Sequence, residues 1–167
     1  KYGADSLRLS LLTGIAPGND TRYSDTKVES CRNFINKLWN ASRFVLMNAE
    51  GKKIPSVEEV KFAPADKWII SRLQNCIREV TTNLGKYELG MASELATDFV
   101  WDDFCDWYIE LSKPALYGED EERKLSALSV LCFVLENALK LLHPFIPFVT
   151  EEIYRNLPGT EGSIMVS

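Results

Sequence analysis

The segment from Glu121 to Leu142 constrains the fold more than any other part of the chain. Its first turn is acidic, as the dipole of a helix favours at an N-terminus. Apolar residues then recur at steps of three and four, which keeps them on one face of an α-helix. They are Leu125, Leu128, Cys132, Leu135, Leu139 and Leu142. We therefore expect a long helix whose apolar face packs against other helices.

Three further segments show the same periodicity. They predict long helices over residues 24–47, 67–84 and 88–112, with shorter helices over 4–13 and after Thr150. The sequence shows no convincing strand, glycine-rich phosphate loop or repeat. Four long amphipathic helices with short connections predict an all-α fold, an up-and-down helical bundle.

Polar and proline residues set the expected helix boundaries. Ser24 or Asp25 is expected to cap the helix over 24–47, and Asp66 to cap the next one. Pro114 is expected to end the helix over 88–112, because the residue before a proline disfavours helical geometry.

Three parts make up the expected domain organisation. Residues 1–20 read as a connector, 21–157 as the bundle, and 158–167 as the start of a linker to a missing C-terminal region. The first residue is not Met and the opening stretch already resembles interior sequence. We expect the chain to be a piece of a longer protein.

Charge is distributed unevenly along the chain. The net charge of −5 argues against a generic, salt-driven binder of DNA or RNA. The window 22–53 nevertheless holds seven basic and three acidic residues, a net charge of +4, whereas 88–123 holds two basic and eleven acidic residues, a net charge of −9. The helix over 24–47 therefore carries the positive surface, and the acidic window is expected to be a solvated face.

The four cysteines and the single histidine favour structural roles. The cysteines lie far apart without a C-x-x-C pair, which supports neither a zinc site nor a disulfide framework. Reduced, mostly buried thiols are typical of the cytoplasm. His143 precedes Pro144 and is expected to end a helix. No apolar run approaches the length that spans a bilayer, so we expect no membrane partner.

The helix over 24–47 carries one aromatic residue among polar ones. At about 100° per residue, Phe44 falls opposite the apolar stripe and shares its face with Asn33, Lys37 and Asn40, while Asn36 and Arg43 lie on the flank. One interpretation is a second packing surface or a singly exposed phenylalanine. The other is a platform on which a base stacks, surrounded by amide and cationic donors, as single-stranded nucleic acid requires.

An enzyme-like pattern occurs in the acidic window. Asp102, Asp103 and Asp106 form the D-D-x-x-D arrangement with which isoprenoid synthases hold magnesium against a diphosphate. The alternative is a plain acidic surface, opposite an apolar face on which Phe104 and Trp107 are expected to belong to the core.

Several stretches together resemble one family, the class I aminoacyl-tRNA synthetases. Residues 1–8, KYGADSLR, are similar to the segment after the K-M-S-K-S loop of these enzymes. Residues 101–110, WDDFCDWYIE, and 143–154, HPFIPFVTEEIY, are similar to helices shared by the valine, leucine and isoleucine enzymes. Residues 33–44, NFINKLWNASRF, resemble the first anticodon-domain helix of the valine-specific members.

The resemblance implies a helical anticodon-binding domain of an enzyme that joins valine to its tRNA with ATP and magnesium. The catalytic and editing domains would precede Lys1, so this chain is expected to carry no catalytic site, metal or cofactor of its own. Its expected partners are the anticodon loop of valine tRNA and the parent catalytic domain, in a monomeric enzyme. A non-catalytic helical protein-interaction module is the alternative.

The resemblance also implies site residues. Phe44 would stack on an anticodon base, and Lys37 and Arg43 would contact the anticodon. Helical geometry adds Asn33, Asn36 and Asn40 as contacts, and Lys27 is a weaker candidate near the start of the same helix. Together with the positive window, the resemblance favours the stacking interpretation of Phe44.

Overall fold

Four long helical stretches pack side by side in the computed structural model, which describes residues 1–14, 18, 20 and 22–167. They are α2 (Asp25–Ala49), α3 (Pro64–Gly85), α6 (Glu121–Leu142), and a composite of α4 (Leu89–Asp98), η2 (Phe99–Tyr108) and α5 (Ile109–Leu116). Short elements complete the chain: α1 (Ala4–Leu12), η1 (Val57–Glu59), α7 (Pro147–Tyr154) and η3 (Ile164–Val166). The described residues contain no strand, so the predicted all-α bundle is confirmed.

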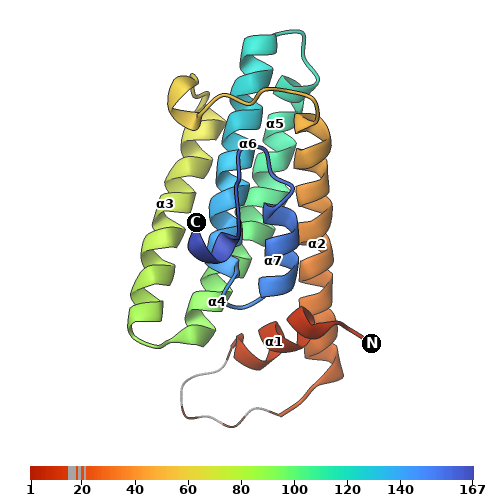
Figure 1. Cartoon of the computed structure of the whole chain (residues 1–167). Coiled ribbons are helices and arrows are strands. Elements are labelled where there is room, and N and C mark those ends of the chain that lie inside the picture. Colours follow the sequence, from red (N-terminus) through yellow and green to blue (C-terminus); the bar gives the residue numbers. More distant parts are fainter. Residues whose placement is uncertain (15–17, 19, 21) are drawn as a thin grey trace.

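Helix α6 is the central core helix. In Figure 1 it runs between α3 and α2, with α4 and α5 behind it and α7 in front. Its bounds are the predicted ones, and Leu128, Leu135, Leu139 and Leu142 are all fully buried. The helix is also long and apolar enough to cross a membrane, contrary to the sequence expectation, but 67% of its apolar window is buried in the bundle. Burial against other helices explains its composition.

The third predicted helix differs most from expectation. Residues Phe99–Tyr108 form a π-helix, in which Ile109 N donates to Phe104 O, five residues back. This changes which residues face inward: Phe104 is fully buried, whereas Trp107 is 61% exposed. The prediction that Trp107 belongs to the core is therefore wrong, because it assumed α-helical spacing.

Pro114 does not end this helix. It lies inside α5, which continues to Leu116. Asp66 is likewise not an N-cap: Ala63 occupies that position, and Asp66, three residues later, accepts a hydrogen bond from Ala63 N at 2.8 Å. The cap at Ser24 is confirmed, since its side chain accepts from Lys27 N.

Contacts between the two ends of the chain hold α7 in place. The last helix begins at Pro147, earlier than predicted, and its own N-cap residue supplies no side-chain hydrogen bond. Asp5 in α1 does so instead, accepting from Phe148 N at 3.4 Å and Val149 N at 2.8 Å. Arg8 donates to the carbonyl oxygens of Pro144 and Phe145. A carboxylate from α1 thus satisfies the donors at the start of α7.

The structure describes the two terminal segments to different extents. The turn residues Ala16, Pro17 and Asn19 of the predicted connector lie outside the described residues. In the predicted linker, Ile164 is buried, and Glu151 of α7 accepts hydrogen bonds from Ser163 Oγ and Ile164 N. Part of that segment therefore packs on the bundle.

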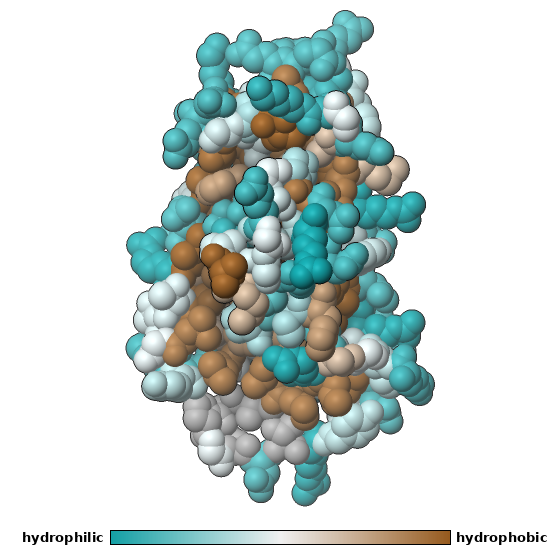
Figure 2. Space-filling view, viewed as in Figure 1, coloured by the Kyte–Doolittle hydropathy of each residue, from teal (hydrophilic) through white to brown (hydrophobic). Residues whose placement is uncertain are grey.

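The face of the molecule that carries α7 is mixed in polarity. Figure 2 shows hydrophilic side chains at its upper end and along its edges, and hydrophobic side chains that gather mainly in its lower half.

Candidate nucleic-acid interface

The buried face of α2 is wider than the apolar stripe that helical spacing predicts. Val28, Cys31, Leu38, Ser42 and Val45 of that stripe are buried and Ile35 is partly buried. Phe34 and Ala41 are buried beside them. Phe34 takes its place in the core by stacking against Trp101 of η2, with ring centroids 6.4 Å apart. The core face of α2 therefore includes the side that faces η2.

Phe44 lies at the margin of that core face. It is partly buried and packs against the core, so it is not opposite the buried stripe as helical geometry predicted. Lys113 of α5 places its Nζ 6.0 Å from the centroid of the Phe44 ring. The ring keeps part of its surface free, and its role in binding stays a prediction.

Of the remaining predicted contact residues, four are exposed, and the fifth, Lys37, is held by contacts with η2. Asn33, Asn36, Asn40 and Arg43 are exposed along the outer face of α2. Exposed amides and a guanidinium on one face offer hydrogen-bond donors and acceptors to an approaching ligand. The structure brings these four side chains to one surface of one helix, as the sequence predicted.

Lys37 is held by the neighbouring π-helix. Its Nζ lies 2.6 Å from Asp106 Oδ1 and 3.7 Å from the centroid of the Trp101 ring. The lysine side chain is 24% exposed and that of Asp106 is 51% exposed. An ion pair and a cation–π contact together fix the ammonium group where α2 meets η2.

Sequence reasoning did not assign Trp101 or Asp106 to this interface. Both belong to a stretch whose spacing predicts core and solvated acid, and which helix each residue faces depends on the π-helical turn. The sequence carries no signal for this pairing, because a surface lysine does not require an ion-pair partner and several acids could supply one.

The other flank of α2 contains a cavity of about 270 Å³ against α7. Its lining residues are Trp39, Ser42, Arg43, Leu46, Glu152, Ile153 and Asn156. Arg43 and Trp39 are exposed, so the outer face of α2 borders this cavity.

Lys27 does not join the outer face of α2. Its Nζ donates to the carbonyl oxygen of Thr13 at 2.6 Å, which ties the start of α2 to the end of α1. This contact gives the lysine a structural role in the free protein.

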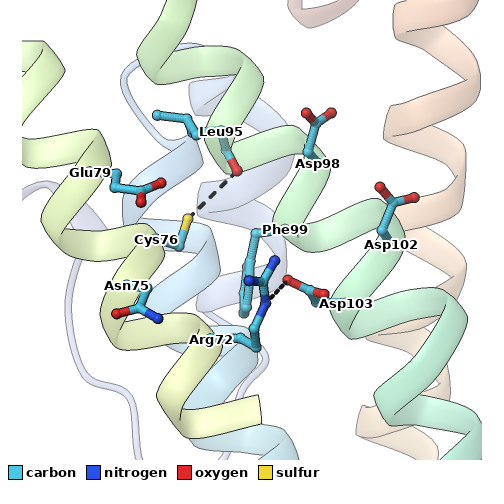
Figure 3. Close-up of a pocket in the computed structure, with 9 residues that line it drawn as sticks. All are labelled: Arg72, Asn75, Cys76, Glu79, Leu95, Asp98, Phe99, Asp102 and Asp103. Carbon is cyan, nitrogen blue, oxygen red and sulfur yellow. Dashed lines mark hydrogen bonds and ion pairs between the residues drawn. The ribbon is translucent and has the colours of Figure 1, made fainter. Parts of the chain in front are cut away.

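The proposed magnesium site is not formed. Figure 3 shows Asp103 directed at Arg72 of α3, while Asp98 and Asp102 lie apart from this pair. Arg72 Nε lies 2.8 Å from Asp103 Oδ2, and Asp106 is paired with Lys37. No three metal-ligating side chains of the described residues come together. Two of the three carboxylates of the D-D-x-x-D pattern are thus engaged by basic side chains of two different helices, which favours the interpretation of this stretch as an acidic surface.

The histidine and the cysteines have the structural roles that the sequence predicted. His143 is buried and its Nδ1 lies 2.8 Å from Thr150 Oγ1, where it ends α6. Burial raises the pKa of Cys76, Cys105 and Cys132 to about 12, which leaves these thiols protonated and unreactive near neutral pH.

Comparisons with known sequences identify the family. Residues 66–167 match the family described as the anticodon-binding domain of tRNA ligase. The chain is 55% identical to a valine–tRNA ligase of Clostridium tetani and 54% identical to one of Bacillus anthracis, in each case over 168 residues. Each alignment covers 100% of this chain and 19% of the relative, so the chain spans about a fifth of the length of these relatives.

Solved structures share the fold. Methionyl-tRNA synthetase of Mycobacterium tuberculosis aligns with a TM-score of 0.75 at 23% identity, covering 89% of this chain and 31% of that one. A leucyl-tRNA synthetase, Agrobacterium radiobacter K84 agnB2 LeuRS in complex with tRNA, aligns with a TM-score of 0.66 at 17% identity, covering 98% of this chain and 19% of that one. At these identities the likeness concerns the fold. The family match covers more than half of the chain and the sequence identity extends over all of it: the chain belongs to the anticodon-binding domain family of tRNA ligases.

Proposed function

We propose that this chain binds the anticodon loop of valine tRNA as the anticodon-binding domain of a valine–tRNA ligase. The observation that carries the proposal is the identity of 53–55% to valine–tRNA ligases over essentially the whole chain. The joining of valine to tRNA with ATP and magnesium belongs, in this proposal, to a separate catalytic domain of a monomeric cytoplasmic enzyme. The helical bundle, in the same proposal, recognises the anticodon loop.

The outer face of α2 supplies the chemistry for this role. The bases of an anticodon loop are unpaired and can turn outward to present their edges and faces. Asn33, Asn36, Asn40 and Arg43 offer hydrogen bonds from exposed positions, and the free part of the Phe44 ring offers a stacking surface at the margin. Each base–aromatic stack contributes roughly 1–3 kcal/mol.

Substitution of Phe44 and Lys37 tests the proposal. In a full-length ligase that carries this chain, Phe44→Ala and Lys37→Ala should each raise the KM for tRNA by about 5- to 150-fold, as expected for one lost stack or base contact. ATP–pyrophosphate exchange, which does not involve the tRNA, should change little. Aminoacylation and exchange kinetics measure the two effects separately.

A matched control is available on another helix. Phe148 in α7 is 65% exposed, so Phe148→Ala removes a surface phenylalanine without touching α2. Its KM for tRNA should stay near that of the unaltered enzyme. An equal loss of exchange and aminoacylation in the Phe44 variant, or tRNA binding that ignores the anticodon sequence, would contradict the proposed function.

A further inference from the structure

Lys37 differs from the other proposed contact residues because a second element fixes its ammonium group. Nζ lies 2.6 Å from Asp106 Oδ1 and 3.7 Å from the centre of the Trp101 ring, and both partners belong to η2. We propose that Asp106 is a specificity-determining residue, which holds Lys37 so that the pair reads the edge of an unpaired adenine or cytosine. This inference rests on the proposed function.

The ion pair changes what the lysine can bind. An unrestrained lysine is a flexible point charge with three donors, and it binds RNA phosphates without regard to sequence. Asp106 accepts one of these donors and offsets the charge, while the Trp101 ring restricts the direction of approach. A lysine held in this way is a poor phosphate binder and a directed hydrogen-bond donor.

The pair also presents an acceptor next to a donor. Asp106 Oδ1 accepts from Lys37, and with the side chain 51% exposed, the carboxylate has further acceptor capacity toward solvent. Adenine and cytosine carry an amino donor beside a ring-nitrogen acceptor, which complements an adjacent carboxylate and ammonium. Guanine and uracil present these groups in the reverse order, a carbonyl oxygen beside a ring N–H. In the orientation that suits adenine or cytosine, their carbonyl oxygen therefore faces the carboxylate and is repelled by it. Because valine codons begin with G and U, the matching anticodon bases are a cytosine and an adenine.

The π-helix provides a matched control for the experiment. Asp103 and Asp106 lie three residues apart on η2, but Asp103 pairs with Arg72 of α3 at 2.8 Å, away from α2 (Figure 3). Asp103→Asn therefore removes the same charge and a similar ion pair from the same element. Asp106→Glu keeps the charge and serves as the rescue variant.

The test measures binding of tRNA transcripts to a full-length ligase carrying this chain. One transcript has the valine anticodon, and two others replace its adenine by guanine or its cytosine by uracil. Asp106→Asn should reduce discrimination against at least one altered transcript about tenfold, the order of one lost base contact. It should also strengthen binding of that altered transcript, because removal of the carboxylate leaves Lys37 free to bind phosphate.

The outcomes separate this inference from the proposed function. Discrimination in the Asp103→Asn variant should match that of the unaltered enzyme, and Asp106→Glu should restore most of it. If Lys37→Ala reduces discrimination but Asp106→Asn behaves like Asp103→Asn, the role of Asp106 is refuted while the proposed function stands. If the unaltered enzyme and all of its variants bind the three transcripts equally, the proposed function itself fails. Weaker binding of all transcripts in proportion, with lower thermal stability, would show that Asp106 acts only on folding.

Discussion

Four thiols differ in their surroundings although none takes part in a disulfide within the described residues. Burial raises the pKa of Cys76, Cys105 and Cys132 to about 12. Burial also raises the pKa of Cys31, but the charge of Lys27 opposes this change. The thiolate is the reactive form, so a raised pKa slows reaction at neutral pH and shifts it to higher pH.

The rates at which the four cysteines are alkylated should follow these differences in thiol pKa. At pH 8 the thiolate fraction of a thiol with a pKa near 12 is about a thousandfold lower than that of an unfolded cysteine. Iodoacetamide should therefore modify Cys31 first and the other three far more slowly, with rates that rise as the pH approaches 12. Peptide mapping by mass spectrometry gives the order, and unfolding in urea should make all four equivalent. Early modification of Cys132 in the folded protein would contradict this expectation.

At the scale of elements, the π-helix decides which aromatic residues support the core. The sequence pattern placed Phe104 and Trp107 on one apolar face, but the wider turn of η2 buries the first and exposes the second. The same turn directs Asp103 to α3 and Asp106 to α2. A single local departure from α-helical geometry thus sets both the packing and the charge pairs of this element.

Truncation of the two aromatics should separate these roles. Phe104→Ala leaves a cavity in a fully buried site and should lower the free energy of unfolding by about 3–5 kcal/mol. Trp107→Ala removes a mostly exposed side chain and should cost less than about 1 kcal/mol. Urea unfolding followed by circular dichroism measures both. Equal losses would mean that Trp107 is buried in solution.

At the scale of the molecule, a buried carboxylate joins three helical elements. Asp66 of α3 is fully buried and accepts a hydrogen bond from Tyr108 Oη of η2 at 2.7 Å. Arg123 of α6 places Nη1 2.9 Å from Asp66 Oδ2, with its side chain 26% exposed. Burial and the nearby charge of Asp66 raise the pKa of Tyr108, so its hydroxyl stays a donor to this carboxylate.

Removal of Arg123 should therefore be costly. Arg123→Ala leaves the Asp66 charge buried without its partner and should destabilise the fold by about 3–5 kcal/mol. A control lies on the same helix, where Glu122 pairs with Lys61 at 3.2 Å in an exposed position. Lys61→Ala should cost less than about 1 kcal/mol. Thermal unfolding of the two variants makes the comparison, and similar melting temperatures would show that the network around Asp66 contributes little.

The sequence by itself determined the parts of this protein that depend on local spacing. Apolar residues at steps of three and four predicted α2, α3 and α6 and the all-α bundle, and they gave the bounds of α6 correctly. The stretch 33–44 indicated the valine-specific family, which is consistent with the identity to valine–tRNA ligases over the whole chain. Asn33, Asn36, Asn40 and Arg43 are exposed as expected, because they lie on the mainly polar face of α2, away from its apolar stripe.

Only the tertiary structure decided which distant residues meet. Phe44 lies at the edge of the core, since Phe34 stacks on Trp101 and turns that side of α2 toward η2. Lys37 gained Asp106 as its partner across 69 residues of sequence. Asp5 came to satisfy the donors at the start of α7 across more than 140 residues. The spacing of residues along one helix predicts which side chains share a face, but not which element that face contacts. The contact depends on how the helices pack and, in η2, on a turn that departs from the α-helical period.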